Sequence, residues 1–134
     1  MPRRKEGPRP VVVGTCTLAP FLKESNAVRL AEGLALVDEM AALARSKGWT
    51  LDLVVLPEHF AQGEKRPLEE EAEPIDGPLV RRLAAKARKY RTYVALSMLL
   101  REGRRFFNAV VILDRRGRPV GTYRKVFPVL HLDG

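Results

Sequence analysis

The chain has 134 residues, of which 46% are hydrophobic, so it has room for one globular domain with one core and is not expected to be disordered. No apolar run reaches the roughly 20 residues that cross a bilayer. The single cysteine, Cys16, and two scattered histidines exclude a disulfide framework and a structural zinc site. The formal net charge of +8 makes a polyanionic partner such as nucleic acid a hypothesis to weigh.

Residues 1–10 form a basic, proline-rich leader, and residues 11–134 form the predicted domain. The leader continues into a valine-rich strand and not into a secretory hydrophobic segment, which together with the single cysteine predicts a cytoplasmic protein. The remaining excess charge is spread over predicted helix faces and hairpin ends. That distribution favours a solvated surface over a dedicated nucleic-acid patch.

The first part of the domain is predicted to form a strand, a helix and a second strand. Residues 11–18 are a short apolar and β-branched run, which is typical of a buried strand. A helix is predicted from an N-cap at Ser25 or Asn26 to a C-cap at Gly48. Its apolar positions recur at helical spacing and are Leu30, Leu34, Val37, Ala41 and Ala44. Residues 51–56 are almost continuously apolar, which predicts a central strand covered on both faces.

The second part is predicted to form a loop, a helix and three strands. Residues 59–74 show no periodicity and are predicted to be a long loop of the kind that often lines a functional site. A helix is predicted to begin at Pro78. Its apolar stripe is Leu79, Leu83, Ala87 and Tyr90, and the basic residues expected to face water are Arg81, Arg82, Lys86, Arg88 and Lys89. Strands follow at 92–100, 106–113 and 119–126, joined by glycine turns, so the order predicts an α/β fold with helices on one face of a mixed sheet.

Glu58 is the first candidate for chemistry, because it comes directly after the predicted strand 51–56. Ligands of open α/β sheets bind at the carboxyl ends of strands, so a catalytic base is expected at such a position. The alternative is a solvated glutamate at a strand end. The neighbouring His59 is a lone histidine in a loop, a placement that more often indicates a structural or solvated side chain.

Lys125 is the second candidate, since Arg124 and Lys125 interrupt an otherwise apolar strand. Strand alternation predicts that these two cations point to opposite faces, so one of them must point toward the buried side or the mouth of the sheet. A lysine held there needs a carboxylate partner, for which Glu58 is a candidate. The alternative is an edge strand that is protected from aggregation by its charges.

Two segments resemble the nitrilase, or carbon-nitrogen hydrolase, family in their order along the chain. Residues 53–58 are similar to the family segment that ends in the catalytic glutamate, here Glu58. Residues 108–113, Gly117 and residues 121–126 resemble the second segment, whose triad lysine corresponds to Lys125. Residues 73–78 and a strand from Tyr93 also follow the family order, so the resemblance extends from Val11 to the end of the chain.

The resemblance implies the N-terminal half of an α-β-β-α sandwich and the hydrolysis of non-peptide C–N bonds in a small amide, carbamoyl compound or nitrile. It implies no metal or organic cofactor and assembly as a homo-oligomer, while the absence of a long apolar run predicts no membrane association. In the family a cysteine thiolate attacks the substrate, a glutamate transfers the proton and a lysine stabilises the negative charge. Glu58 and Lys125 are therefore the expected catalytic residues of this chain.

The chain departs from the family pattern in its nucleophile. The family cysteine follows the lysine by a few tens of residues, whereas this sequence stops at Gly134. Cys16 lies in the first predicted strand, where inert packing is expected. We therefore expect a half that is truncated before its nucleophile and is inactive alone, with an uncovered apolar sheet face that promotes association.

Two other functions compete with a hydrolase half. One is a catalytically inactive scaffold or fragment of the same fold. The other is a basic nucleic-acid-binding protein, which ranks lower because no RNP-like or helix-turn-helix signature places the few aromatic residues on a binding surface. The sequence does not discriminate an amide substrate from a nitrile, and it does not indicate the oligomeric order.

Overall fold

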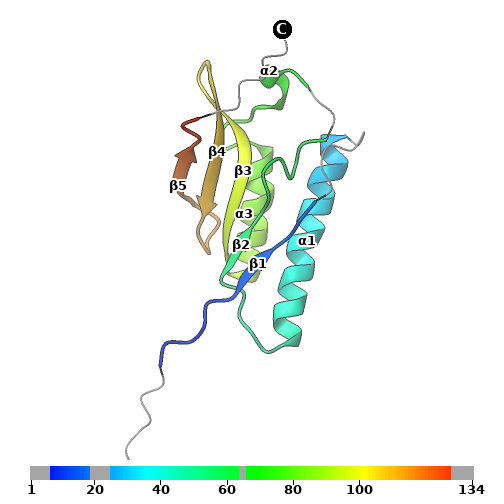
Figure 1. The fold of residues 1–134 in the computed structure, drawn as a ribbon, viewed down its shortest axis with the longest axis vertical. Helices are drawn as coiled ribbons and strands as arrows, with labels where there is room; N and C mark the ends of the chain where they lie inside the picture. Colours follow the sequence, from blue (N-terminus) through cyan, green and yellow to red (C-terminus); the bar gives the residue numbers. More distant parts are fainter. Residues whose placement is uncertain (1–6, 19–24, 64–65, 128–134) are drawn as a thin grey trace, which may run out of the picture.

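A computed structural model describes residues 7–18, 25–63 and 66–127. The elements are β1 (Val13–Thr15), α1 (Asn26–Ser46), β2 (Leu53–Val55), α2 (Leu68–Glu71), α3 (Pro78–Tyr90), β3 (Tyr93–Glu102), β4 (Arg105–Leu113) and β5 (Pro119–Arg124). The strands form one sheet in the order β1-β2-β3-β4-β5. The first three strands are parallel, and β4 and β5 continue the sheet as antiparallel hairpins (Figure 1). The predicted mixed sheet is confirmed.

Helix α1 begins and ends where the sequence predicts, but its buried face differs. Ser25 is the N-cap and accepts the Val28 N–H, and Gly48 takes a positive φ of 70° just after the helix. The buried residues are Arg29, Gly33, Val37, Ala41 and Ala44. Leu30 and Leu34 of the predicted stripe are partly buried and pack against the same core. Gly33 is buried beneath Phe60, whose ring packs so closely on it that a Cβ at Gly33 would lie 2.6 Å from the ring.

Helix α3 confirms the prediction of a proline start, since Pro78 follows the N-cap Gly77. Its buried residues are Leu79, Val80, Leu83, Ala84 and Ala87. The expectation that Lys86 faces water is wrong. Its ammonium lies 2.6 and 2.7 Å from the two carboxylate oxygens of Asp38 on α1, and its side chain is 20% exposed. The Tyr90 hydroxyl donates to the same carboxylate, so these groups tie the two helices together.

Replacing Lys86 by Met is expected to lower the free energy of unfolding by about 1 kcal/mol, because Asp38 would lose a charge-assisted hydrogen-bond partner in a half-exposed setting. Urea unfolding at neutral pH measures the change. Arg82→Met on the exposed side of α3 is the matched control, and it should change the free energy of unfolding by less than about 0.5 kcal/mol. Equal effects of the two substitutions would contradict the expected role of Lys86.

The segment predicted as a structureless loop, residues 59–74, contains the short helix α2 and pairs with β3 near its end. The backbone carbonyl of Pro67 accepts the N–H groups of Glu70 and Glu71, which closes a single turn too short to produce a periodic sequence. Glu73 then accepts the Arg101 N–H at 2.9 Å and donates its own N–H to the Leu99 carbonyl at 3.0 Å. The segment is thereby fixed against the sheet.

Both long helices pack on one face of the sheet, and the opposite face carries no helix among the described residues (Figure 1). The prediction that residues 51–56 are covered on both faces is therefore wrong, since Val54 is fully buried on the helix side while Val55 is 37% exposed. By strand alternation Val13, Tyr93 and Tyr123 lie on the same open face. No helix within the described ranges is long and apolar enough to span a membrane.

We expect the chain to self-associate through this open apolar face. Val55→Lys, on strand β2 of this face, should shift the protein toward the monomer in size-exclusion chromatography over a range of concentrations. Leu43→Lys is the control, because Leu43 is also an exposed apolar residue, at 59%, but lies on α1. If Val55→Lys elutes as the parent chain does, association does not use this face.

Candidate active site

Glu58 lies just beyond the end of β2, where the chain makes a sharp turn. The next residue, His59, has a positive φ of 60°, and the turn is closed by hydrogen bonds from the Phe60 N–H to the Pro57 carbonyl and from the Gln62 N–H to the His59 carbonyl. Phe60 is fully buried. The Glu58 carboxylate therefore projects from a turn that is anchored on both sides by buried residues, Leu56 and Phe60.

The structure brings Glu58 and Lys125 together, as the pairing hypothesis required. The Lys125 ammonium lies 3.3 Å from Oε1 of Glu58. Strand β5 ends at Arg124, so Lys125 lies just outside the strand that was predicted to include it. Arg124 instead pairs with Glu102 and lies over the Phe107 ring, 5.0 Å from its centroid. The two cations thus have separate partners, and Lys125 is the one at the mouth of the sheet.

Asn108 of β4 completes the cluster, although the sequence analysis did not identify it as a site residue. Its side-chain amide donates to Oε1 of Glu58 at 2.7 Å. The signal that could have indicated it is a single amide side chain within residues 106–113, whose other members are apolar. His59 adds a weaker contact, with Nε2 at 3.6 Å from the same carboxylate oxygen.

These contacts favour the ionised form of the Glu58 carboxyl group. The hydrogen bond from Asn108 is the largest influence and holds the pKa of Glu58 below its usual range. The hydrogen bond and charge of Lys125 act in the same direction, while partial desolvation opposes them. The side chains of Glu58 and Lys125 are 50% and 37% exposed, so water still screens the pair. The carboxylate is thus available as a base.

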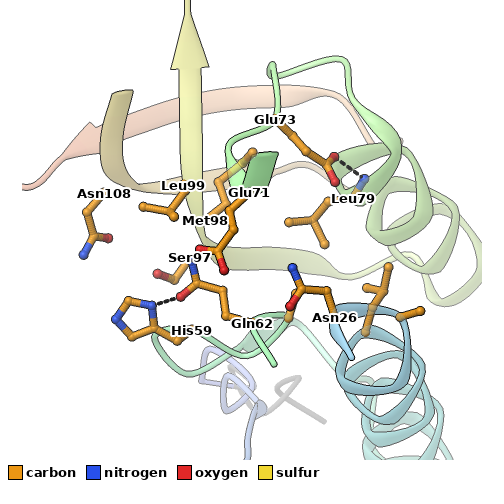
Figure 2. A pocket seen from close by; sticks show the side chains of 13 residues that line it. Asn26, His59, Gln62, Glu71, Glu73, Leu79, Ser97, Met98, Leu99 and Asn108 are labelled. Carbon is orange, nitrogen blue, oxygen red and sulfur yellow. Dashed lines mark hydrogen bonds between the residues drawn. The ribbon is translucent and has the colours of Figure 1, made fainter. Parts of the chain in front are cut away.

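A small cavity of about 210 Å³, lined by both polar and apolar side chains, lies beside the cluster. It is lined by Asn108 and His59, the neighbours of Glu58, but not by Glu58 or Lys125 themselves. Figure 2 shows these two residues on one side of the cavity and Asn26 on the other. Gln62 contacts His59 and donates to Glu71 at 3.3 Å. Four polar residues of segment 59–74 line this cavity; they are His59, Gln62, Glu71 and Glu73.

Comparison with known proteins identifies the family. The model of the carbon-nitrogen hydrolase family matches residues 12–131. The chain belongs to the carbon-nitrogen hydrolase family. A bifunctional nitrilase/nitrile hydratase of Nicotiana tabacum is 30% identical over 113 residues, which are 69% of this chain and 32% of the relative. The chain therefore spans about a third of the length of such curated relatives.

Solved structures of carbon-nitrogen hydrolases show the same fold. The Helicobacter pylori enzyme has a TM-score of 0.71 and 20% identity over 86% of this chain and 39% of its own. An amidase double mutant from Nesterenkonia sp. AN1, in complex with acrylamide, has a TM-score of 0.63 and 22% identity over 91% of this chain and 46% of its own. The predicted nitrilase-type α/β fold is confirmed, with this chain matching only part of each relative.

Cys16, the only cysteine of the chain, has the properties of a packing residue. Its side chain is partly buried against the hydrophobic core, and burial raises the pKa of the thiol. A nucleophilic cysteine of a hydrolase needs a lowered pKa. In the part of the chain that the structure describes, no three His, Cys, Asp or Glu side chains gather as metal ligands.

Proposed function

We propose that this chain supplies the base and the cationic group of a carbon-nitrogen hydrolase site that acts on a small amide, carbamoyl compound or nitrile. The observation that carries the proposal is the Glu58–Lys125 pair, whose carboxylate and ammonium lie 3.3 Å apart at the carboxyl end of β2, beside a small cavity. A paired carboxylate and ammonium suit a reaction that moves a proton and develops negative charge.

Each residue has a distinct task in this proposal. Glu58 accepts the proton of a cysteine thiol as its sulfur attacks the substrate carbon, and for an amide it returns that proton to the departing ammonia or amine. Lys125 stabilises the negative charge on the oxygen of the tetrahedral intermediate formed from an amide, or on the nitrogen as a nitrile becomes a thioimidate. Glu58 then takes a proton from water, whose oxygen attacks the thioester and releases the acid and the thiol.

The nucleophile in this proposal comes from outside residues 1–134, because Cys16 is partly buried against the core and its thiol pKa is raised. A second polypeptide segment would also cover the open sheet face and exclude water from the pair. The acrylamide complex of the Nesterenkonia amidase supports an amide, and the nitrilase relatives support a nitrile. The competing function is a scaffold of the same fold without chemistry.

The test is complementation. The chain is mixed with a separately produced C-terminal half of a carbon-nitrogen hydrolase that carries its cysteine, and ammonia release is measured from a panel of amides, carbamoyl compounds and nitriles. A complex that releases ammonia, while neither half does so alone, supports the proposal. A folded complex without activity on the whole panel would support the scaffold function instead.

A further inference from the structure

We propose that Asn108 is the positioning residue of the Glu58–Lys125 pair, holding the carboxylate through its side chain and the lysine through its backbone. This inference rests on the proposed function. Asn108 lies on β4, 50 positions along the sequence from Glu58. The hydrogen bond of its side chain links β4 to the turn that follows β2.

The side chain of Asn108 forms a hydrogen bond with only one of the two carboxylate oxygens of Glu58. On β4 it is paired with Leu99 of β3 and alternates to the face away from the helices. Its amide nitrogen lies 2.7 Å from Oε1 of Glu58, and the Lys125 ammonium approaches the same oxygen at 3.3 Å. Among the described residues, Oε2 of Glu58 has no such donor. Asn108 therefore leaves Oε2 as the oxygen that accepts the proton.

The backbone of Asn108 places the lysine. Its carbonyl accepts the N–H of Lys125 at 2.8 Å, which adds one hydrogen bond to the β4–β5 ladder beyond the last strand residue, Arg124. This bond ties the Cα of Lys125 to the residue whose side chain holds Glu58. Because the carbonyl belongs to the main chain, a substitution of the Asn108 side chain removes only the contact with the carboxylate.

Such a restraint is needed because the pair is half exposed. A glutamate and a lysine on flexible side chains gain little from each other in water, since ordering them costs entropy. A neutral amide donor at 2.7 Å restricts the Glu58 rotamer and favours the ionised carboxylate without adding charge. It is also the largest influence that keeps the pKa of Glu58 low.

The first test measures the pKa of Glu58 in the 134-residue chain by NMR titration of the ¹³C-labelled glutamate carboxyls. Asn108→Leu, which has a similar shape but no donor, should raise that pKa. Asn108→Asp should raise it further, because a second carboxylate would lie beside Glu58. Ser97→Ala is the matched control, as Ser97 lines the same cavity on the same sheet face without a hydrogen bond to Glu58.

An unchanged Glu58 pKa in Asn108→Leu, or an equal rise in Ser97→Ala, would overturn the inference. Amide spectra confirm that each variant is folded, and Asn108→Asp serves as the second probe if the leucine variant is not. None of these readouts needs a nucleophile, so they stand whether or not the chain is part of a hydrolase.

The second test uses the complemented complex. There Asn108→Leu should lower kcat and move the acidic limb of the pH profile upward. Val110→Ala should stay close to the parent, because Val110 lies on the same face of β4 but does not line the cavity. If Glu58→Gln abolishes activity but Asn108→Leu changes neither kcat nor the pH profile, the positioning role is wrong and the hydrolase function stands. If Glu58→Gln leaves activity intact, the proposed function is wrong, whatever the Glu58 pKa measurements show for Asn108.

Discussion

Glu58→Gln is expected to lower kcat of the complemented hydrolase by about 10²- to 10⁴-fold, the usual contribution of a positioned general base. Glutamine keeps the shape of the side chain and still accepts a hydrogen bond from Asn108, but it takes no proton from a thiol or a water molecule. Lys125→Ala should lower kcat by about 10²- to 10³-fold, because negative charge on the intermediate would lose its cationic partner.

Matched controls separate these losses from a general effect of charge. Glu69→Gln removes an exposed carboxylate on α2, and Lys47→Ala removes an exposed ammonium at the end of α1. Both should leave kcat within about twofold of the parent, since surface substitutions away from a site have small effects. A Glu58→Gln complex that releases ammonia at the parental rate would rule out Glu58 as the base.

Asp52→Asn is expected to lower the free energy of unfolding by about 2–3 kcal/mol at pH 7, the cost of losing charge-assisted hydrogen bonds to a buried carboxylate. Asp52 is 6% exposed and lies at the other end of β2 from Glu58. It accepts hydrogen bonds from Arg9 at 2.6 and 2.8 Å, from Arg115 at 2.9 Å and from the Val12 N–H at 3.0 Å. One carboxylate thus joins the leader residue Arg9, strand β2 and the β4–β5 turn.

The same substitution should change how stability depends on pH. The Arg9 hydrogen bond, followed by that of the Val12 N–H, holds the pKa of Asp52 well below its usual range. A depressed folded-state pKa contributes stability that is complete above the unfolded value of about 4 and is lost as the pH falls toward the folded value. The difference in unfolding free energy between parent and Asp52→Asn should therefore be largest at neutral pH and shrink below about pH 4.

Urea unfolding at several pH values between 7 and 3 measures this difference. Asp76→Asn is the control, because Asp76 is exposed in the turn before α3 and should affect stability by less than about 0.5 kcal/mol. A parent-to-variant difference that stays constant down to pH 3 would mean that the Asp52 carboxylate is not held ionised by its arginine partners.

Much of the fold was predictable because its signals are local. The Ser25 cap, Pro78 at the start of α3, and the glycine turns with φ of 60° at Gly103 and 74° at Gly117 all depend on residues within a few positions of one another. The buried face of α1 was predicted less well. Phe60 lies after β2 and outside α1, so its packing on Gly33 could not be read from the periodicity of the helix.

The sequence by itself determined the elements, their order, and two of the candidate residues, Glu58 and Lys125, through the motifs that surround them. Only the tertiary structure decided that Lys125 lies outside β5 and that Asn108 binds the Glu58 carboxylate. It also decided that Asp52 binds Arg9 and Arg115 at the other end of β2. The reason is physical. These contacts join residues 43 to 67 positions apart, so they exist only once strand order and register have brought the segments together.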